Sequence, residues 1–263
     1  MILERILRDK KIEVSRAKKR IPLEKLKQQI AQLPKRKSRF LSALKKGKGV
    51  HVIAEIKRRS PSNGLLCRDF DPVKIARQYE RAGASALSVL TDKKYFGGSS
   101  AILEKVRKAT PLPILRKDFT IDAYQIYEAQ AMGADAILLI VRTLSKGSLK
   151  KFYAVAEKLG LETLFEIHDE ADWKKIASLK TRVVGINNRD LSNFHVDLGV
   201  TKRLAPKIGK GPLVVSESGI SSAEDLTALK ECGVRAVLVG EKLMRESDPG
   251  KALRRLLQTA HAR

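Results

Sequence analysis

Short apolar runs alternate with longer amphipathic segments from Val52 to the end of the 263-residue chain. Apolar runs of a few residues are typical of buried strands, and apolar residues spaced three or four apart are typical of helices. Strands are predicted at residues 52–57, 86–90, 112–117, 135–141, 162–167, 183–187, 213–217 and 235–239. Because a helical segment follows each predicted strand, the strands are expected to be parallel and joined by right-handed crossovers.

Four of the predicted helix-to-strand junctions have similar sequences, as in QAMGADAILLI and KECGVRAVLVG. Each carries a glycine where the helix ends, at positions 83, 133, 160 and 233. The residue after a helix often takes a left-handed conformation, which glycine adopts without the steric cost of a Cβ atom. The repeated strand and helix units favour a single (β/α)₈ barrel, the TIM-barrel fold, over a doubly wound open sheet.

The segment before these repeats is expected to be a helical extension, residues 1–50, packed on a barrel formed by residues 51–263. Apolar spacing in residues 2–20 predicts an amphipathic helix. Pro22 is expected in the first turn of a second helix, where proline is tolerated, and Pro34 is expected to end that helix.

A short third helix is predicted inside the basic stretch from Pro34 to Lys48. Its apolar residues are Phe40, Leu41 and Leu44. Phe40 and Leu44 are expected to anchor the extension to the barrel.

The composition is typical of a parallel sheet covered by helices, with 43% hydrophobic and only 5% aromatic residues. No apolar run approaches the roughly 18 residues of a membrane span, and charges interrupt the first ten residues, so neither a membrane span nor a secretory signal is expected. Cys67 and Cys232 are far apart and lack C-x-x-C spacing, which argues against a zinc site and a disulfide framework. We therefore expect a reduced, cytoplasmic protein.

The chain is strongly basic, with a formal net charge of +24. Residues 1–50 hold 17 Lys or Arg and 4 acidic residues, so more than half of the excess lies there. Such an excess is compatible with nucleic-acid binding, but Pro34 to Lys48 contains one aromatic residue and no stacking pattern. A solvated surface, or a field that attracts an anionic small molecule, is the favoured interpretation, and no nucleic-acid partner is expected.

Charged and polar residues gather at the C-terminal ends of the predicted strands, where barrels of this kind carry their functional groups. They are Glu55, Lys57, Lys117, Glu166, Asn187, Arg189, Glu217 and Ser218. Glu55 and Lys57 are two positions apart on one strand and therefore face the same side. Each residue alone is as compatible with a solvated strand end or an ion pair as with function. Together they would be costly to desolvate unless they paired or met a polar ligand.

The last two strands carry a second signal, because phosphate sites in this fold are built after them. SESGISSAED turns through Gly219 into a helix that Ser222 and Asp225 are expected to cap, and Gly240 precedes a short helical segment that begins at Glu241. Backbone N–H groups at glycine turns bind a dianion without cationic side chains. Ordinary turn chemistry is the alternative. Ser60, after the first strand, is expected to add a hydrogen bond.

The remaining sequence patterns are weak evidence for a metal site, a catalytic dyad or a cofactor site. The four histidines show no metal-ligand spacing, and His168 next to Asp169 is expected to begin a helix rather than to form a catalytic dyad. The chain contains no G-x-S-x-G, G-x-G-x-x-G or G-x-x-x-x-G-K motif. Neither a metal nor a nucleotide cofactor is expected. Phe96 and Phe119 follow the second and third strands, where they either line an apolar pocket or pack in the core.

Seven stretches, in order along the chain, resemble the indole-3-glycerol phosphate synthase family. They are AEIKRRSPS, SVLTDKKYFGGS, PILRKDF, LFEIHDEAD, GINNRDL, VVSESGI and VLVGEKLM. The resemblance covers essentially the whole chain, including the N-terminal extension. One departure is Lys242, where the family more usually has a small residue, and it affects little beyond local charge because backbone groups are expected to hold the phosphate there.

The resemblance implies a decarboxylating lyase of tryptophan biosynthesis whose substrate is 1-(2-carboxyphenylamino)-1-deoxyribulose 5-phosphate. Lys117 is then the general acid that protonates the ketone oxygen during ring closure. Lys57 holds the substrate carboxylate and is a candidate second acid in dehydration, with Glu55 orienting it. Glu166 is the partner of substrate hydroxyls or removes a proton, and Asn187 fixes the ribulose-derived chain.

The resemblance assigns the remaining residues to binding. Ser218 adds a polar contact in the catalytic set. The expected substrate-binding residues are Arg189, Glu217, Phe96, Phe119, Leu138 and Leu191, of which the four apolar ones hold the aromatic ring. The expected phosphate-binding residues are Ser60, Gly219, Gly240 and Glu241. The protein is expected to be a monomer.

A lysine acid works best when its pKa lies near the working pH. Burial and nearby cations lower a lysine pKa, whereas nearby carboxylates raise it, and the sequence does not say which effect wins.

Two alternative functions also stay open: another phosphate-binding barrel enzyme such as phosphoribosylanthranilate isomerase, and a basic nucleic-acid-binding protein.

Overall fold

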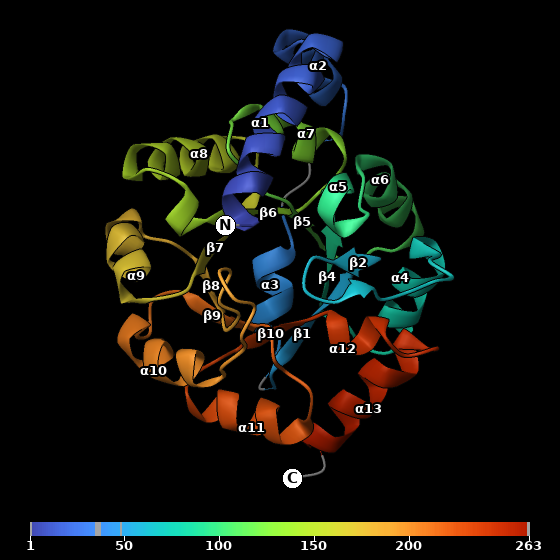
Figure 1. The fold of residues 1–263 in the computed structure, drawn as a ribbon, viewed down its shortest axis with the longest axis vertical. Coiled ribbons are helices and arrows are strands. Elements are labelled where there is room, and N and C mark those ends of the chain that lie inside the picture. Colours follow the sequence, from blue (N-terminus) through green and yellow to red (C-terminus); the bar gives the residue numbers. More distant parts are fainter. Residues whose placement is uncertain (1, 35–37, 48, 262–263) are drawn as a thin grey trace.

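The computed structural model describes residues 2–34, 38–47 and 49–261. Within these ranges, eight parallel strands close into a barrel and the connecting helices lie on its outside (Figure 1). The predicted (β/α)₈ fold is confirmed. In order around the barrel, the strands are β1 (His51–Ile56), β4 (Ala86–Leu90), β5 (Ile114–Lys117), β6 (Ala136–Ile140), β7 (Glu162–Ile167), β8 (Val183–Asn187), β9 (Leu213–Glu217) and β10 (Ala236–Val239).

Strand β1 closes the barrel by pairing on both sides. Ile53 lies opposite Ala86 of β4, and Val52 lies opposite Val237 of β10. Strands such as β6, with the sequence AILLI, are apolar throughout because one face fills the barrel and the other packs under helices. All eight predicted strands are present, with ends that differ from the prediction by at most one or two residues.

The outer helices begin and end at ordinary capping signals. Asp71 accepts hydrogen bonds from two backbone N–H groups at the start of its helix, and Ser222 with Asp225 forms the predicted capping box. Gly83, Gly133, Gly160 and Gly233 have φ values of 94°, 81°, 74° and 85°, so the predicted left-handed conformation is confirmed. These helices are α4 (Pro72–Arg81), α5 (Lys93–Phe96), α6 (Ser100–Ala109), α7 (Tyr124–Ala131), α8 (Lys146–Lys158), α9 (Glu170–Ile176), α10 (Gly199–Ile208), α11 (Ala223–Glu231), α12 (Glu241–Met244) and α13 (Pro249–His261), with the short turns η1 (Val141–Thr143) and η2 (Ala177–Leu179).

Two N-terminal helices, α1 (Ile2–Arg20) and α2 (Leu23–Ala31), lie near α7, with α2 beside the barrel and the first turn of α1 over the barrel mouth (Figure 1). The prediction placed Pro22 in the first turn of α2. The structure instead gives Pro22 an extended conformation, with φ −57° and ψ 149°, and makes it the residue before the helix. Its carbonyl still accepts a hydrogen bond from the Leu26 N–H, so proline caps the helix without losing a bond.

Helix α3 (Phe40–Lys45) packs against the inside of the barrel at the end where the strands begin. The side chains of Phe40 and Leu44 are fully buried there. Arg39, just before the helix, donates a hydrogen bond to the carbonyl of Pro111, which precedes β5. Residues 35–37 and 48 of the predicted basic stretch lie outside the described residues.

A small antiparallel hairpin, β2 (Arg59–Ser60) and β3 (Gly64–Leu65), follows β1. The sequence prediction missed it because strands of two residues are too short to show periodicity. Arg58 ties the hairpin to the following chain, since its carbonyl accepts hydrogen bonds from two backbone N–H groups. The hairpin places Ser60 at the mouth of the barrel.

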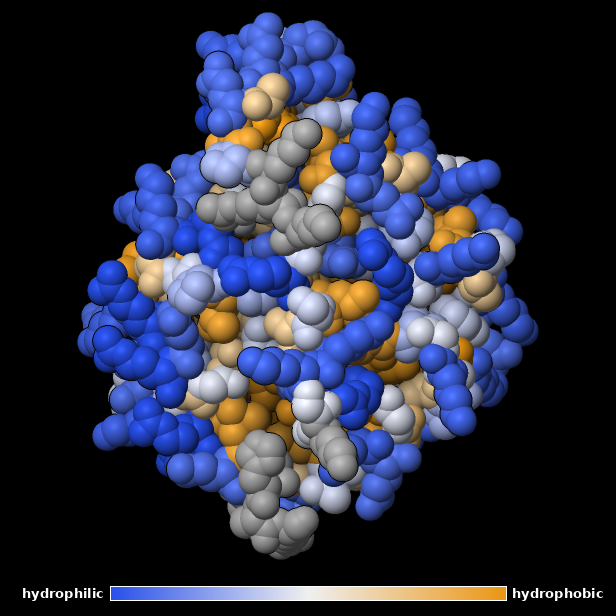
Figure 2. All heavy atoms as spheres, turned by 180° about the vertical axis from the view of Figure 1, so that it is seen from behind, coloured by the Kyte–Doolittle hydropathy of each residue, from blue (hydrophilic) through white to orange (hydrophobic). Residues whose placement is uncertain are grey.

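Apolar side chains are buried in two main layers, one inside the barrel and one between the strands and the helices. The face seen from behind Figure 1 is mostly hydrophilic, with hydrophobic residues scattered among the charged ones (Figure 2). No helix in the described ranges is both long enough and apolar enough to cross a membrane.

Candidate active site

A pocket opens where the strands end, and every strand of the barrel contributes to it directly or through the residues that follow it. This is the functional end of a (β/α)₈ barrel. The residues predicted from the sequence all line this one pocket: Glu55, Lys57, Ser60, Phe96, Lys117, Phe119, Leu138, Glu166, Asn187, Arg189, Leu191, Glu217, Ser218, Gly219, Gly240 and Glu241.

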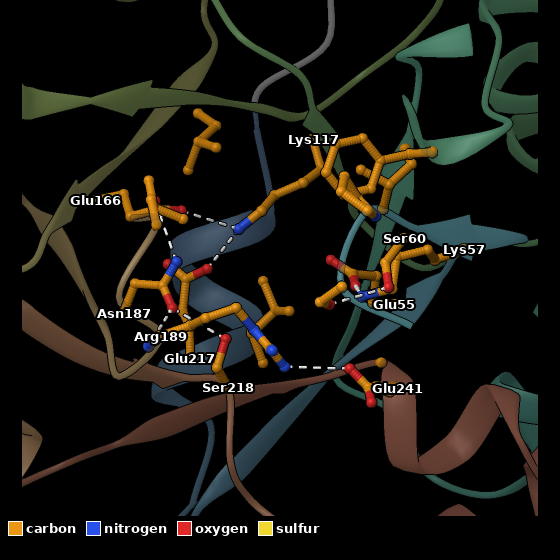
Figure 3. A pocket seen from close by; sticks show the side chains of 18 of the residues that line it. Glu55, Lys57, Ser60, Lys117, Glu166, Asn187, Arg189, Glu217, Ser218 and Glu241 are labelled. Carbon is orange, nitrogen blue, oxygen red and sulfur yellow. Dashed lines mark hydrogen bonds and ion pairs between the residues drawn. The ribbon is translucent and has the colours of Figure 1, made fainter. Parts of the chain in front are cut away.

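Lys117 lies at the centre of the polar side of the pocket (Figure 3). Its Nζ is 3.1 Å from Oε2 of Glu166 and 2.5 Å from Oε2 of Glu217. The lysine side chain is 14% exposed and the two carboxylates are almost fully buried, so these ion pairs are only weakly screened by solvent. One ammonium therefore faces two carboxylates.

The structure decides the direction of the lysine pKa. Burial alone would lower the pKa of Lys117, but attraction to Glu217, Glu166 and Glu55 outweighs it and raises the pKa above the ordinary value. The opposite happens at Glu217, where burial and the neighbouring Glu166 carboxylate raise the pKa to about 7 despite the attraction of Lys117. Lys117 therefore carries its proton at neutral pH, whereas Glu217 is partly protonated at that pH.

Glu55 and Lys57 form a second ion pair on the other side of the pocket (Figure 3). The Lys57 Nζ is 2.6 Å from Oε1 of Glu55, so the two side chains do face the same way, as their spacing predicts. Burial would raise the pKa of Glu55, but Lys57 and Lys117 outweigh it and lower the pKa. Ser88 on β4 donates a hydrogen bond to the same carboxylate.

Asn187 connects Glu166, the partner of Lys117, to residues that follow β8 and β9. Its Nδ2 donates to Oε1 of Glu166 at 3.2 Å, and its Oδ1 accepts from Ser218 Oγ at 2.9 Å and from the Arg189 backbone N–H. Ser218 has a positive φ of 68°, which is uncommon for a residue with a side chain. The amide is thus held at both ends.

Two glycines leave room for the buried carboxylates. A Cβ atom on Gly185 would lie 2.1 Å from Oε1 of Glu217, and one on Gly240 would lie 2.4 Å from Oε1 of Glu55. Gly240 was predicted only for its place at the phosphate end. The requirement for Gly185 was not predicted, because nothing in the sequence shows which side chain lies above it.

Replacing Gly185 by alanine is expected to push the Glu217 carboxylate away from Lys117 and to lower kcat about tenfold or more, because atoms cannot approach to 2.1 Å. Gly211→Ala is the matched control, since a Cβ there would meet nothing within 4 Å. Steady-state kinetics of both variants measure the effect. Equal kcat in the two variants would show that the position of Glu217 does not matter.

An apolar wall faces the polar groups. The rings of Phe96 and Phe119 lie with centroids 6.1 Å apart. Leu138 and Leu191 also line the pocket. Helix α1 supplies further apolar side chains, those of Ile2, Leu3 and Ile6. The sequence showed that α1 has an apolar face but not that part of this face covers the pocket.

The predicted phosphate end lies between the β2–β3 hairpin and the turns after β9 and β10. Gly219 has a positive φ of 82°, and the Ser60 Oγ accepts a hydrogen bond from the Asn63 N–H at 3.2 Å. The side chain of Glu241 is engaged elsewhere, because its carboxylate accepts hydrogen bonds from Arg189 at 3.1 Å and from Arg245 at 3.3 Å. Only the backbone of Glu241 is suited to an anion.

Lys10 of α1 is a buried residue that the sequence prediction missed. Its Nζ is 2.8 Å from Oδ1 of Asp118, 3.0 Å from Oδ2 of Asp92 and 2.9 Å from Oε2 of Glu13, and its side chain is 1% exposed. Asp118 directly follows Lys117. Lys10 thus ties α1 to the chain beside the central lysine. No sequence signal separates it from the solvated lysines of the same helix.

The described residues contain no group of three or more His, Cys, Asp or Glu side chains that could hold a metal ion.

A family model described as indole-3-glycerol phosphate synthase matches residues 3–256. The chain belongs to the indole-3-glycerol phosphate synthase family. The resemblance inferred from the seven motifs is therefore confirmed, and the isomerase alternative is set aside.

Curated relatives with that name match nearly the full chain. The protein from Acetivibrio thermocellus is 48% identical over 255 residues, which cover 97% of this chain and 98% of the relative. The protein from Dehalococcoides mccartyi is 46% identical over 260 residues, which cover 98% of this chain and all of the relative.

Solved structures with low sequence identity share the fold. A thiamine phosphate pyrophosphorylase from Pyrococcus furiosus has a TM-score of 0.61 at 16% identity and covers 82% of this chain and 97% of its own. A 3-hexulose-6-phosphate synthase from Salmonella typhimurium has a TM-score of 0.66 at 11% identity and covers 81% of this chain and 99% of its own. At such low identity the likeness supports the barrel architecture alone.

Proposed function

We propose that the protein closes the indole ring of 1-(2-carboxyphenylamino)-1-deoxyribulose 5-phosphate, with loss of carbon dioxide and water, to give indole-3-glycerol phosphate in tryptophan biosynthesis. Family membership supports this carboxy-lyase activity. The observation that carries the chemistry is one protonated lysine, Lys117, held between two carboxylates beside an apolar wall.

Ring closure is the first step. The aromatic carbon that bears the carboxylate attacks the ketone carbon, and the ketone oxygen takes a proton from the Lys117 Nζ as negative charge develops on it. The apolar wall of Phe96, Phe119, Leu138 and Leu191 holds the ring against the attacked carbon, which removes much of the entropic barrier to closure.

Decarboxylation follows ring closure. Lys57 binds the substrate carboxylate, and Glu55 holds the lysine in place at 2.6 Å. The bond between the ring and the carboxylate breaks, its electron pair restores the aromatic ring, and carbon dioxide leaves.

Dehydration completes the indole. Lys57 protonates the departing hydroxyl group, and Glu166 removes a proton from the neighbouring CH₂, so that a carbon–carbon double bond forms as water leaves. Glu166 is 3.1 Å from Lys117, so it returns this proton to the acid that was used in the first step. Lys57 regains its proton from solvent, which supplies the one proton that the loss of a carboxylate as carbon dioxide consumes. Asn187 is hydrogen-bonded to both Glu166 and Ser218, and so fixes their positions relative to each other during the reaction cycle.

The phosphate end of the substrate is placed at Ser60, Gly219, Gly240 and the backbone N–H of Glu241. Backbone donors at glycine turns suit a phosphate dianion. Arg189 lines the pocket next to this group, and its guanidinium, which pairs with Glu241 at 3.1 Å, is the proposed cation for the anionic substrate.

Turnover of the proposed substrate tests the activity. Purified protein is incubated with 1-(2-carboxyphenylamino)-1-deoxyribulose 5-phosphate while indole fluorescence and carbon dioxide release are followed. Both signals are expected to rise together in a 1:1 ratio. A folded preparation that gives neither product would refute the proposed function.

The protonation of Glu217 predicts a pH dependence. Its pKa in the free protein is raised to about 7, so the carboxylate is neutral below that pH and negatively charged above it. Because the charged form holds Lys117 towards the substrate, kcat/KM is expected to rise as the pH increases through about 7 and to level off above it. The pH profile of Glu217→Gln should lack this limb, and a limb that persists in the variant would assign it to another group.

We further propose that the enzyme works as a cytoplasmic monomer, with residues 1–50 as an extension of a barrel formed by residues 51–263. A single chain supplies all the predicted site residues, which supports the monomer. Light scattering coupled to size exclusion measures the mass in solution, and fractionation of the producing cells tests the location.

A further inference from the structure

His168 follows β7 directly, and its imidazole contacts Glu166. The Nε2 atom is 3.5 Å from Oε1 of Glu166, and the histidine side chain is only 5% exposed. Asn187 donates to the same carboxylate oxygen, while Lys117 donates to the other one. Glu166 is therefore surrounded by three nitrogen-bearing side chains, of which the proposed chemistry uses two.

The other ring nitrogen of His168 faces a second carboxylate. Its Nδ1 is 3.7 Å from Oδ2 of Asp172 on α9. That oxygen is itself held, because it accepts hydrogen bonds from the backbone N–H of His168 at 3.0 Å and from Nε of Arg142 at 3.3 Å. Glu166, His168 and Asp172 therefore form a row of carboxylate, imidazole and carboxylate that runs from the pocket towards the outside of the barrel.

Both ring nitrogens of His168 are buried and lack a hydrogen-bond partner within the described part of the chain. A buried polar group without a partner costs free energy, so such a group needs an explanation. The two contacts, at 3.5 and 3.7 Å, are only a few tenths of an ångström longer than hydrogen bonds. Catalytic hydrogen bonds are often long in the free enzyme and shorten when substrate binds.

We propose that His168 is a positioning residue for this reaction, one that acts through Glu166 and whose role rests on the function proposed for that carboxylate. When the imidazole carries both protons, Nε2 donates to Glu166 and Nδ1 donates to Asp172. Asp172 fixes the ring orientation, as the third member of a catalytic triad does. Glu166 is then held in its charged form, ready to remove the proton from the CH₂ group during dehydration.

The charged neighbours of the imidazole belong to several elements. Attraction to the Lys117 cation favours the charged form of Glu166 in the same way as the imidazole does. The groups around the ring are Glu166 of β7, Asp169 and Asp172 at α9, Arg142 of η1, Asp190 after β8 and, beyond Glu166, Lys117.

His168→Leu removes both nitrogens while keeping an apolar volume. We expect kcat to fall about 10- to 100-fold with KM changed less than about threefold, because the base and not the binding contacts is affected. The limb of the kcat profile that belongs to Glu166, which lies at lower pH than that of Glu217, should also move to higher pH, since Glu166 loses a group that favours its charged form. His168→Gln, which keeps an N–H donor, should recover part of kcat.

His51→Leu is the matched control. His51 is also a partly buried histidine, but it lies at the start of β1, at the opposite end of the barrel, and contacts Ser85. This variant should keep the kcat and the pH profile of the wild type. Circular dichroism and thermal unfolding of all three variants show whether each is folded.

Two results would overturn the role of His168. One is a His168→Leu variant with wild-type kcat. The other is an equal loss in His168→Leu and His168→Gln with an unchanged pH profile, which would indicate a structural role. The wild-type protein is measured alongside: its failure to turn over the substrate would refute the proposed function, whereas an active wild type with an unaffected His168→Leu variant would refute only the role of His168.

Discussion

Replacing Lys117 by alanine is expected to lower kcat by about 10³-fold and to leave the fold intact. The loss follows from the position of its ammonium, which is held between two carboxylates of the pocket, at 3.1 Å from Glu166 and 2.5 Å from Glu217. General-acid catalysis by a positioned group contributes roughly 10²- to 10⁴-fold. Single-turnover and steady-state measurements of indole fluorescence give kcat and KM.

The fold is expected to survive because Glu217 already binds a proton near neutral pH. Its pKa of about 7 lets the pocket lose the lysine charge by taking up one proton on Glu217, so that a single carboxylate charge remains. Lys105→Ala is the matched control, because Lys105 is an exposed lysine on α6. Near wild-type kcat in a folded Lys117→Ala variant would remove Lys117 from the role of acid.

Replacing Lys10 by methionine is expected to lower the free energy of unfolding by about 3–5 kcal/mol, which is the cost of breaking a buried ion pair by removing one partner. Methionine keeps the aliphatic part of the side chain but removes the buried cation that Asp92 and Asp118 share, which leaves Asp118 with Arg116 at 3.3 Å. KM should also rise, because α1 carries three of the apolar side chains that line the pocket. Urea unfolding followed by circular dichroism measures the change in stability.

Lys11→Met tests whether the effect belongs to the buried position. Lys11 is the exposed neighbour on the same helix, and an exposed substitution usually changes stability by less than about 0.5 kcal/mol. Adding Asp92→Asn to Lys10→Met should recover part of the loss, because one buried charge is removed. Equal stability of the Lys10 and Lys11 variants would show that the buried cluster contributes nothing.

Acid should weaken the same cluster. Burial opposes ionisation of Asp118, but Lys10 and Arg116 outweigh it and lower its pKa from 3.8 to about 2. The contribution of this aspartate to stability is therefore complete above pH 3.8 and is lost as the pH falls through about 2. The stability difference between wild type and Lys10→Met should shrink over that range.

Much of the fold and of the pocket could be predicted from the sequence because both follow from local periodicity. Each strand is a short apolar run, and side chains two positions apart share a face, which placed Glu55 and Lys57 together. Parallel strands all end on one side of the barrel, so reading the residues at their ends was enough to bring Lys117, Glu166 and Glu217 into one pocket.

The remaining features depend on how elements distant in the sequence pack. Lys10 and Lys11 are adjacent lysines on one amphipathic helix, yet one is 1% exposed and the other is exposed, because only one faces Asp92 and Asp118. His168 was predicted only to begin a helix with Asp169, whereas in the structure Asp169 caps α9 and His168 lies just before that cap. Its contact with Glu166 depends on how the ring is packed between β7 and α9.

The sequence alone predicted the barrel, its eight strands and the set of charged residues at its mouth, since these depend on spacing within a few residues. Only the tertiary structure decided which of these residues are charged and which neighbouring side chains hold them in place. Lys117 illustrates the difference, because burial and neighbouring carboxylates act on its pKa in opposite directions. The balance depends on distances of a few ångströms between side chains on different strands, and such distances exist only once the barrel has closed.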